Sequence, residues 1–139
     1  MGRVQIQQSI SARQNELRAA QQELDELREK HAGLCGLLNR IEMQRGSFID
    51  TIYRKRNRLD AAAALAGKVR AAKAYHTKMS KSLNEDDFVY ATAKIDEFHD
   101  ATIREKQATV RQIDNLEARI RMLSSQLSTL RYNLARCED

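Results

Sequence analysis

Three histidines and two cysteines are the residues of this sequence best suited to proton transfer, metal binding or nucleophilic attack. We assign no metal-ligand partner to His31, His76 or His99. The neighbours His99 and Asp100 cannot act together on a helix, because adjacent helical positions do not share a face. The sequence also shows no glycine-rich phosphate loop, nucleophile elbow or HExxH motif. We therefore predict no catalytic residue, no metal site and no cofactor, and we expect a protein that is not an enzyme.

The two cysteines, Cys35 and Cys137, lie far apart in the sequence and lack metal-ligand spacing. We predict two free thiols and keep a disulfide between them as the alternative.

The composition indicates which secondary structure carries the histidines and cysteines. The chain has 139 residues, no Pro, no Trp and five Gly, and aromatic residues make up 5% of it. Mean hydropathy is −0.64. Such a profile is typical of long helices with apolar seams rather than a thick core. We therefore predict one all-α domain over residues 1–139.

The first 41 residues carry an unbroken alternation of four- and three-residue spacings. This seam consists of Ile6, Ile10, Arg13, Leu17, Ala20, Leu24, Leu27, His31, Leu34, Leu38 and Ile41. A period of 3.5 residues is that of a coiled coil. Arg13 and His31 are either tolerated polar layers or residues that fix the register of a partner. The pattern predicts a helix with a narrow apolar edge that must be covered by another helix.

Two breaks divide the chain into three predicted helices over residues 4–45, 47–82 and 85–136. Gly46 could end the first helix and Ser47 could begin the second. Ser82 followed by Glu85 fits a capping box. The predicted fold is an elongated antiparallel helical hairpin or a three-helix coiled-coil bundle. If Gly46 is not a turn, the first two segments form one rod folded against the third.

The third segment has a seam that we predict to be interrupted. It starts at Phe88 and runs through Phe98, then Ile103 and Val110, with an extra residue between Phe98 and Ile103. Such a stutter locally unwinds a supercoil. From Ile113 onward the heptad spacing is strict.

The stretch 45–81 is strongly basic. Ten Lys and Arg stand against Asp50 and Asp60, giving +8, whereas the whole chain carries +5. Either these charges form a solvated face paired with acidic neighbours, or they dock an acidic partner. The candidate basic docking residues are Arg54, Lys55, Arg56 and Arg58.

Three stretches resemble a known family. They are Ile6–Leu17, Gly46–Arg54 and Ile95–Leu123. Together they are similar to the small helical proteins encoded beside LXG toxins of type VII secretion, which are relatives of the WXG-motif helical hairpins. The sequence departs from that family because it has no Trp-x-Gly turn and no Tyr-x-x-x-Asp/Glu export signal. The resemblance implies an adaptor or chaperone that binds the N-terminal helical domain of a toxin.

We therefore expect a non-enzymatic adaptor whose exposed seams bind a helical protein partner. The predicted partner-binding residues are Leu17, Leu24, Leu27, Leu34, Leu38, Leu116, Ile120, Leu123, Leu127 and Leu130. One alternative is nucleic-acid binding through the basic stretch 45–81. Another is a self-associating structural coiled-coil stalk.

The location of the protein is a further expectation. No apolar run approaches the length of a membrane span, and the first residues contain no apolar signal core. We expect a cytoplasmic protein, with co-secretion alongside its partner as an extension of that expectation.

Overall fold

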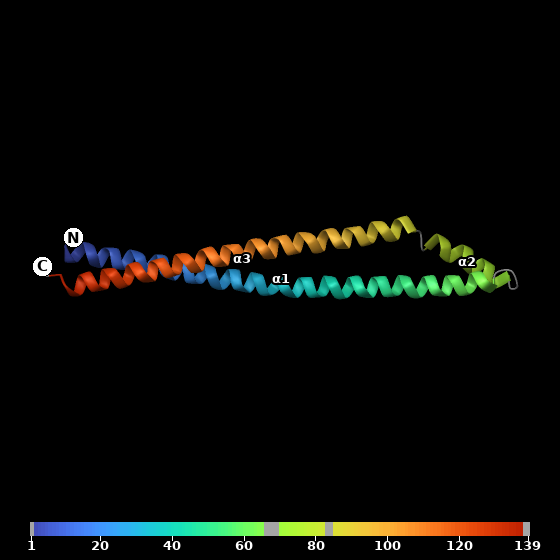
Figure 1. Ribbon diagram of the computed structural model, residues 1–139, viewed down its shortest axis with the longest axis horizontal. Helices are drawn as coiled ribbons and strands as arrows, with labels where there is room; N and C mark the ends of the chain where they lie inside the picture. Colours follow the sequence, from blue (N-terminus) through green and yellow to red (C-terminus); the bar gives the residue numbers. More distant parts are fainter. Residues whose placement is uncertain (1, 66–69, 83–84, 138–139) are drawn as a thin grey trace. The chain divides into compact units, whose positions relative to one another are not determined.

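Three helices make up nearly all of the described chain. The computed structural model describes residues 2–65, 70–82 and 85–137 (Figure 1). Helix α1 is Arg3–Leu65, α2 is Arg70–Ser82 and α3 is Glu85–Ala135. Their sequences are rich in Ala, Leu, Arg, Glu and Gln, which favour helix. The described residues are 98% helical and include no strand, which confirms the all-α prediction.

These helices form two compact units, each of which is considered by itself. Unit 1 combines Met1–Cys35 with Arg104–Asp139, and unit 2 is Gly36–Ile103. Unit 1 therefore holds the beginning of α1 and most of α3. Unit 2 holds the rest of α1, all of α2 and the beginning of α3. The prediction of a single domain stays a prediction.

Unit 1 is an antiparallel pair of helices closed by aliphatic side chains. Its core contains Ala20 and Leu24 of α1 with Leu116 and Leu123 of α3, and Leu17, Leu27, Ile113 and Ile120 pack against it. The start of α1 (blue) and the end of α3 (red) lie side by side in Figure 1. Ion pairs between the helices join Glu16 to Arg119 and Lys30 to Glu105, so residue numbers rise along α1 as they fall along α3.

Unit 2 also pairs α1 with α3 in antiparallel order, and here aromatic and ionic contacts accompany the buried aliphatic residues Leu38, Ile41 and Ala62. The rings of Phe48 and Phe88 stack with centroids 5.9 Å apart. The Arg45 Nε donates to Asp96 Oδ1 at 2.7 Å, and its Nη2 reaches Oδ2 at 3.4 Å. The pKa of Arg45 is raised above its ordinary value, mainly because the guanidinium donates hydrogen bonds to Asp96. The seam of this unit thus combines buried aliphatic side chains with half-buried aromatic and charged ones.

The predicted break at Gly46 is wrong, and so are the predicted helix ends at 45 and 47. Helix α1 passes through Gly46 and Ser47 and ends at Leu65, and no described glycine has a positive φ. A glycine in a helix interior costs about 1 kcal/mol relative to alanine. The half-buried row Arg45, Phe48 and Ile52 keeps heptad spacing across Gly46, so packing on both sides outweighs that local preference.

The predicted helix over 47–82 is therefore divided between α1 and α2. The alternative of a rod through Gly46 holds as far as Leu65. The sequence also predicts a weaker three- and four-residue pattern of apolar positions in this stretch, at Phe48, Ile52, Leu59, Ala62, Ala66 and Val69. Of these, Ala66 and Val69 lie outside the described residues. Helix α3 begins at Glu85, as predicted. The predicted capping box lies outside what the structure describes, because it depends on residues 83–84 and on the side chains of Ser82 and Glu85.

The predicted stutter in the third segment is also wrong. Phe98 is 54% exposed and Val110 is 38% exposed, whereas Thr102 and Thr109 are buried. The buried and half-buried row keeps the four–three alternation along α3 at Phe88, Thr92, Ile95, His99, Thr102, Lys106, Thr109, Ile113, Leu116, Ile120, Leu123, Leu127, Leu130 and Leu134. The seam stays in phase because polar residues (Thr92, His99, Thr102 and Thr109) occupy positions where hydrophobic residues were expected, and of these Thr102 and Thr109 are buried.

The threonine hydroxyls make these buried positions acceptable. Thr102 donates to the carbonyl of Phe98 at 2.8 Å, and Thr109 donates to the carbonyl of Glu105 at 2.9 Å. A buried hydroxyl without such a bond would be costly. Both threonines therefore satisfy their polar atoms within α3.

Candidate docking surface

The ten predicted partner-binding residues lie on the seams within the molecule. Leu24, Leu38, Leu116, Leu123 and Leu127 are buried. Leu17, Leu27, Leu34, Ile120 and Leu130 are half-buried. We expected at best half of these residues to be free for a partner, because some must hold the fold together. The five buried residues are covered by the chain's own helices, whereas the five half-buried residues keep part of their surface exposed. Whether their remaining surface contacts a partner stays a prediction.

The described part of the chain, residues 2–65, 70–82 and 85–137, provides no set of three His, Cys, Asp or Glu side chains that could hold a metal ion. The sequence analysis did not identify one contact, that between His31 and Cys35, which are four residues apart on α1. Both ring nitrogens of His31 lie 3.9 Å from the Cys35 Sγ. Cys35 and Cys137 are both free, as predicted.

His99 is placed on the seam of unit 2 between two carboxylates. Its Nε2 lies 3.3 Å from Glu42 Oε1 on α1, and its Nδ1 lies 3.4 Å from Asp100 Oδ1 on its own helix. Hydrogen bonding to Glu42, and then to Asp100, raises the pKa of His99. A protonated His99 can donate to both carboxylates, so its charge supports the pairing of α1 with α3 in this unit. The prediction that His99 and Asp100 cannot act together is therefore wrong, because the imidazole reaches the carboxylate of the next residue while it bridges to Glu42 on the other helix.

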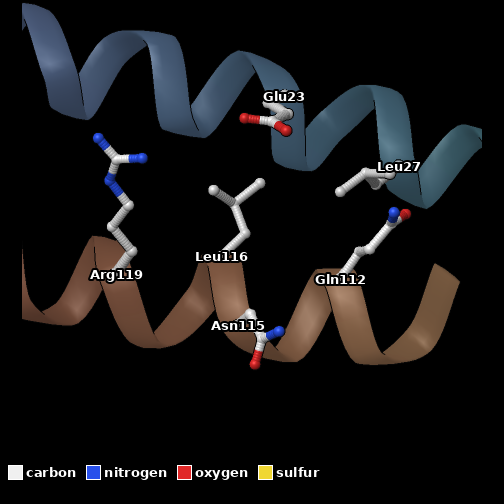
Figure 2. Close-up of a pocket in the computed structure, with 6 residues that line it drawn as sticks. All are labelled: Glu23, Leu27, Gln112, Asn115, Leu116 and Arg119. Atoms are coloured by element: carbon white, nitrogen blue, oxygen red, sulfur yellow. The ribbon is translucent and has the colours of Figure 1, made fainter. Parts of the chain in front are cut away.

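A groove runs between α1 and α3 in unit 1. It is lined by Glu23 and Leu27 of α1 and by Gln112, Asn115, Leu116 and Arg119 of α3. Figure 2 shows Leu116 pointing from α3 toward α1, whereas Asn115 turns away. The Arg119 guanidinium reaches Glu16, at 3.9 Å. The groove thus lies at the edge of the leucine seam and is flanked by charged side chains. Among its lining residues, Glu23 is the one carboxylate.

The four predicted basic docking residues are not equivalent. The Arg56 guanidinium lies 4.8 Å from the centroid of the Phe88 ring, so it is a cation–π partner inside unit 2. Arg54, Lys55 and Arg58 are exposed. The residues that the structure describes provide no ion pair to these three. Arg56 is therefore engaged within unit 2, and Arg54, Lys55 and Arg58 remain as the exposed residues of the predicted basic surface.

Exposed aromatic residues are the feature of unit 2 that sequence reasoning missed. All three Phe and three of the four Tyr fall within Gly36–Ile103, and Tyr132 lies in unit 1. Tyr53 and Tyr90 are each 65% exposed, and Phe98 is 54% exposed. The Lys94 ammonium lies over the Tyr90 ring, 5.7 Å from its centroid, and also pairs with Glu97. The strongly uneven placement of aromatic residues along the sequence was the available signal.

Helix α2 presents a face made almost entirely of cations. Ala72, His76 and Met79 are half-buried and spaced four and three residues apart, so they mark its inner face. The exposed side carries a shallow groove lined by Arg70, Lys73, Ala74, Thr77, Lys78 and Lys81. The Thr77 hydroxyl is bonded to the carbonyl of Lys73 at 3.0 Å.

Comparisons with family models, curated proteins and solved structures find no match to this chain. The resemblance to partner proteins of LXG toxins therefore stays a prediction. Within the described residues, no helix has both the length and the apolar character that crossing a membrane demands.

Proposed function

We propose that this protein is a non-enzymatic adaptor that binds a helical protein partner through unit 2. The observation that carries the proposal is the group of exposed aromatic residues in that unit, chiefly Tyr53, Tyr90 and Phe98. Aromatic side chains are enriched at protein interfaces and dominate their binding energy, because they bury a large area with few rotatable bonds.

The packing of unit 1 supports a division of roles. Its leucine seam is occupied by the chain's own helices, with Leu123 only 1% exposed. A partner helix that needed this seam would have to displace α1 or α3. Unit 1 therefore holds the helix pair together, and docking falls to the side chains that unit 2 leaves uncovered.

The resemblance found in the sequence suggests the class of partner. It points to the N-terminal helical domain of an LXG toxin encoded beside this protein. Phe98 and Tyr90 lie about two turns apart on α3, a separation that a partner helix can contact along its length.

Co-expression with the large protein encoded by the adjacent gene tests this proposal. We expect the two proteins to co-purify, and we expect Phe98→Ser with Tyr90→Ser to reduce recovery of the complex at least tenfold. The matched control is Val110→Ser with Met122→Ser, which alters two exposed apolar residues of unit 1 and should leave recovery unchanged.

Two results would contradict the adaptor proposal. One is failure of the wild-type proteins to co-purify. The other is a stable homodimer in light scattering that persists when the adjacent protein is added, because this would favour the structural stalk. Equal loss in both double variants would contradict the assignment of docking to unit 2, because the contact would then not be confined to its aromatic residues.

A further inference from the structure

The exposed face of α2 has a chemistry different from that of the aromatic surface. It displays Arg70, Lys73 and Lys81, and the described residues supply none of these three with an ion pair. Lys78 lies on the same face. Helix α2 contains no acidic residue, so nothing on the helix itself offsets this charge.

Arg70, Lys73 and Lys81 form a stripe along one side of α2. They are three and eight residues apart, and Thr77 occupies the helical turn between Lys73 and Lys81 on this side. At about 1.5 Å per residue, the stripe is about 16 Å long. That length is about half a turn of a nucleic-acid duplex.

The scarcity of apolar side chains in the groove on α2 distinguishes three kinds of anionic partner. Protein interfaces need buried aromatic or aliphatic anchors and are depleted in lysine, but this groove offers only Ala74 as an apolar side chain. A helix lying in a membrane surface needs a broad exposed apolar face, but Ala72 and Met79 are half-buried on the inner side of α2 and Tyr75 is only 37% exposed. A phosphate backbone needs only a row of cations.

We propose that the face of α2 formed by Arg70, Lys73 and Lys81 binds the phosphate backbone of nucleic acid without reading its sequence. The sequence hypothesis placed this activity on the whole basic stretch 45–81, in which Arg56 is engaged by Phe88. The structure instead supports α2 as the main contact. This binding is independent of the adaptor function, because it uses other residues and another helix.

Fluorescence anisotropy with a labelled duplex DNA of arbitrary sequence tests the proposal with the whole chain. We expect the affinity to fall steeply as salt rises from about 50 to 200 mM, because binding releases counterions. Changing Arg70, Lys73 and Lys81 together to Gln should weaken binding at least tenfold at low salt. It should also reduce the slope of log affinity against log salt by about 2.7, since each phosphate contact contributes about 0.9.

The matched control removes three positive charges from unit 1. Arg18, Arg121 and Arg131 are exposed, and changing them to Gln lowers the net charge equally. We expect this control to change affinity less than threefold. Exchanging Lys and Arg for one another on α2 (R70K, K73R and K81R) should preserve binding, and circular dichroism should show equal helicity in all variants.

Four results would overturn the proposal. They are no binding of the wild type at low salt, equal loss of binding in the unit 1 control, loss of binding in the charge-preserving variant, and displacement of DNA by polyglutamate or phosphatidylserine vesicles at matched charge concentration. None of these results bears on co-purification with a helical partner, so the two proposals fail separately.

Discussion

Units 1 and 2 use the same pairing of α1 with α3 but fill the seam with different side chains. In unit 1, Leu24, Leu116 and Leu123 exclude water from the space between the helices. In unit 2, Phe48 stacks on Phe88, and the Arg45–Asp96 pair lies at the edge. Burial of aliphatic groups is worth more than partly exposed ion pairs, which contribute about 0–1 kcal/mol each. The comparison teaches that one architecture can close one region and leave another available for binding.

The largest expected effect comes from removing the best-buried leucine of unit 1. Leu123→Ala should lower the free energy of unfolding by about 2–5 kcal/mol, because it leaves a cavity in the seam. Urea denaturation followed by circular dichroism measures this change. The adjacent Met122 is 53% exposed, so Met122→Ala is the matched control and should change stability by less than about 0.5 kcal/mol. Equal effects of the two substitutions would mean that unit 1 is not closed by its leucines.

A smaller effect is expected from the aromatic pair of unit 2. In a double-mutant cycle with Phe48→Ala and Phe88→Ala, the coupling free energy should be about 0.5–1.5 kcal/mol, as for other aromatic pairs. Urea denaturation of the four proteins gives this value. Adding Arg56→Gln to the series measures the cation–π contact with Phe88. A coupling indistinguishable from zero would contradict the stacked geometry.

Gly46→Ala tests whether α1 is a continuous helix within unit 2. A Cβ added at Gly46 meets no atom within 4 Å, and the helix continues on both sides. We therefore expect the substitution to stabilise the protein by about 0.5–1 kcal/mol, because alanine favours helix over glycine. Thermal or urea unfolding would show this gain. Destabilisation would instead support the turn that the sequence suggested.

The smallest expected effect is a pH dependence confined to unit 2. The pKa of His99 is raised in the folded state by Glu42 and Asp100, so its contribution is fully present below the unfolded pKa of about 6.5. That contribution is lost as pH rises through the folded pKa. Hydrogen exchange of amides near His99 should therefore accelerate above neutral pH more than exchange near Leu123.

The substitution His99→Gln provides the control for this pH dependence. It should abolish the difference between the two regions across the same pH range, because glutamine does not titrate. A difference that persists in this variant would show that His99 is not its source.

The overall class and much of the seam could be predicted from the sequence because both follow from hydrophobic periodicity. The row from Ile6 to Ile41 and the row beyond Ile113 are regular enough that their burial could be inferred directly. Arg13 and His31 were correctly placed on the seam, where both are half-buried. Heptad spacing is a property of the sequence itself, so it survives into the structure.

The remaining errors arise where local preference and tertiary packing disagree. Gly46 favours a break, but the seam residues Arg45 and Phe48 on either side keep it helical. Phe98 is more hydrophobic than its neighbour His99, yet the phase set by the rest of α3 leaves Phe98 outside and His99 on the seam. The cation–π contact of Arg56 depends on a residue from another helix, so no local pattern contains it.

The unbroken seam of α3 also limits how the length of this protein can change. Removing seven consecutive residues from α3 would return every later side chain to the same row, whereas removing five or six would rotate the later leucines toward water. A matching seven-residue cut in α1 would be needed to keep opposite side chains aligned. Shorter or longer versions of such a protein are therefore expected to differ in paired steps of one heptad.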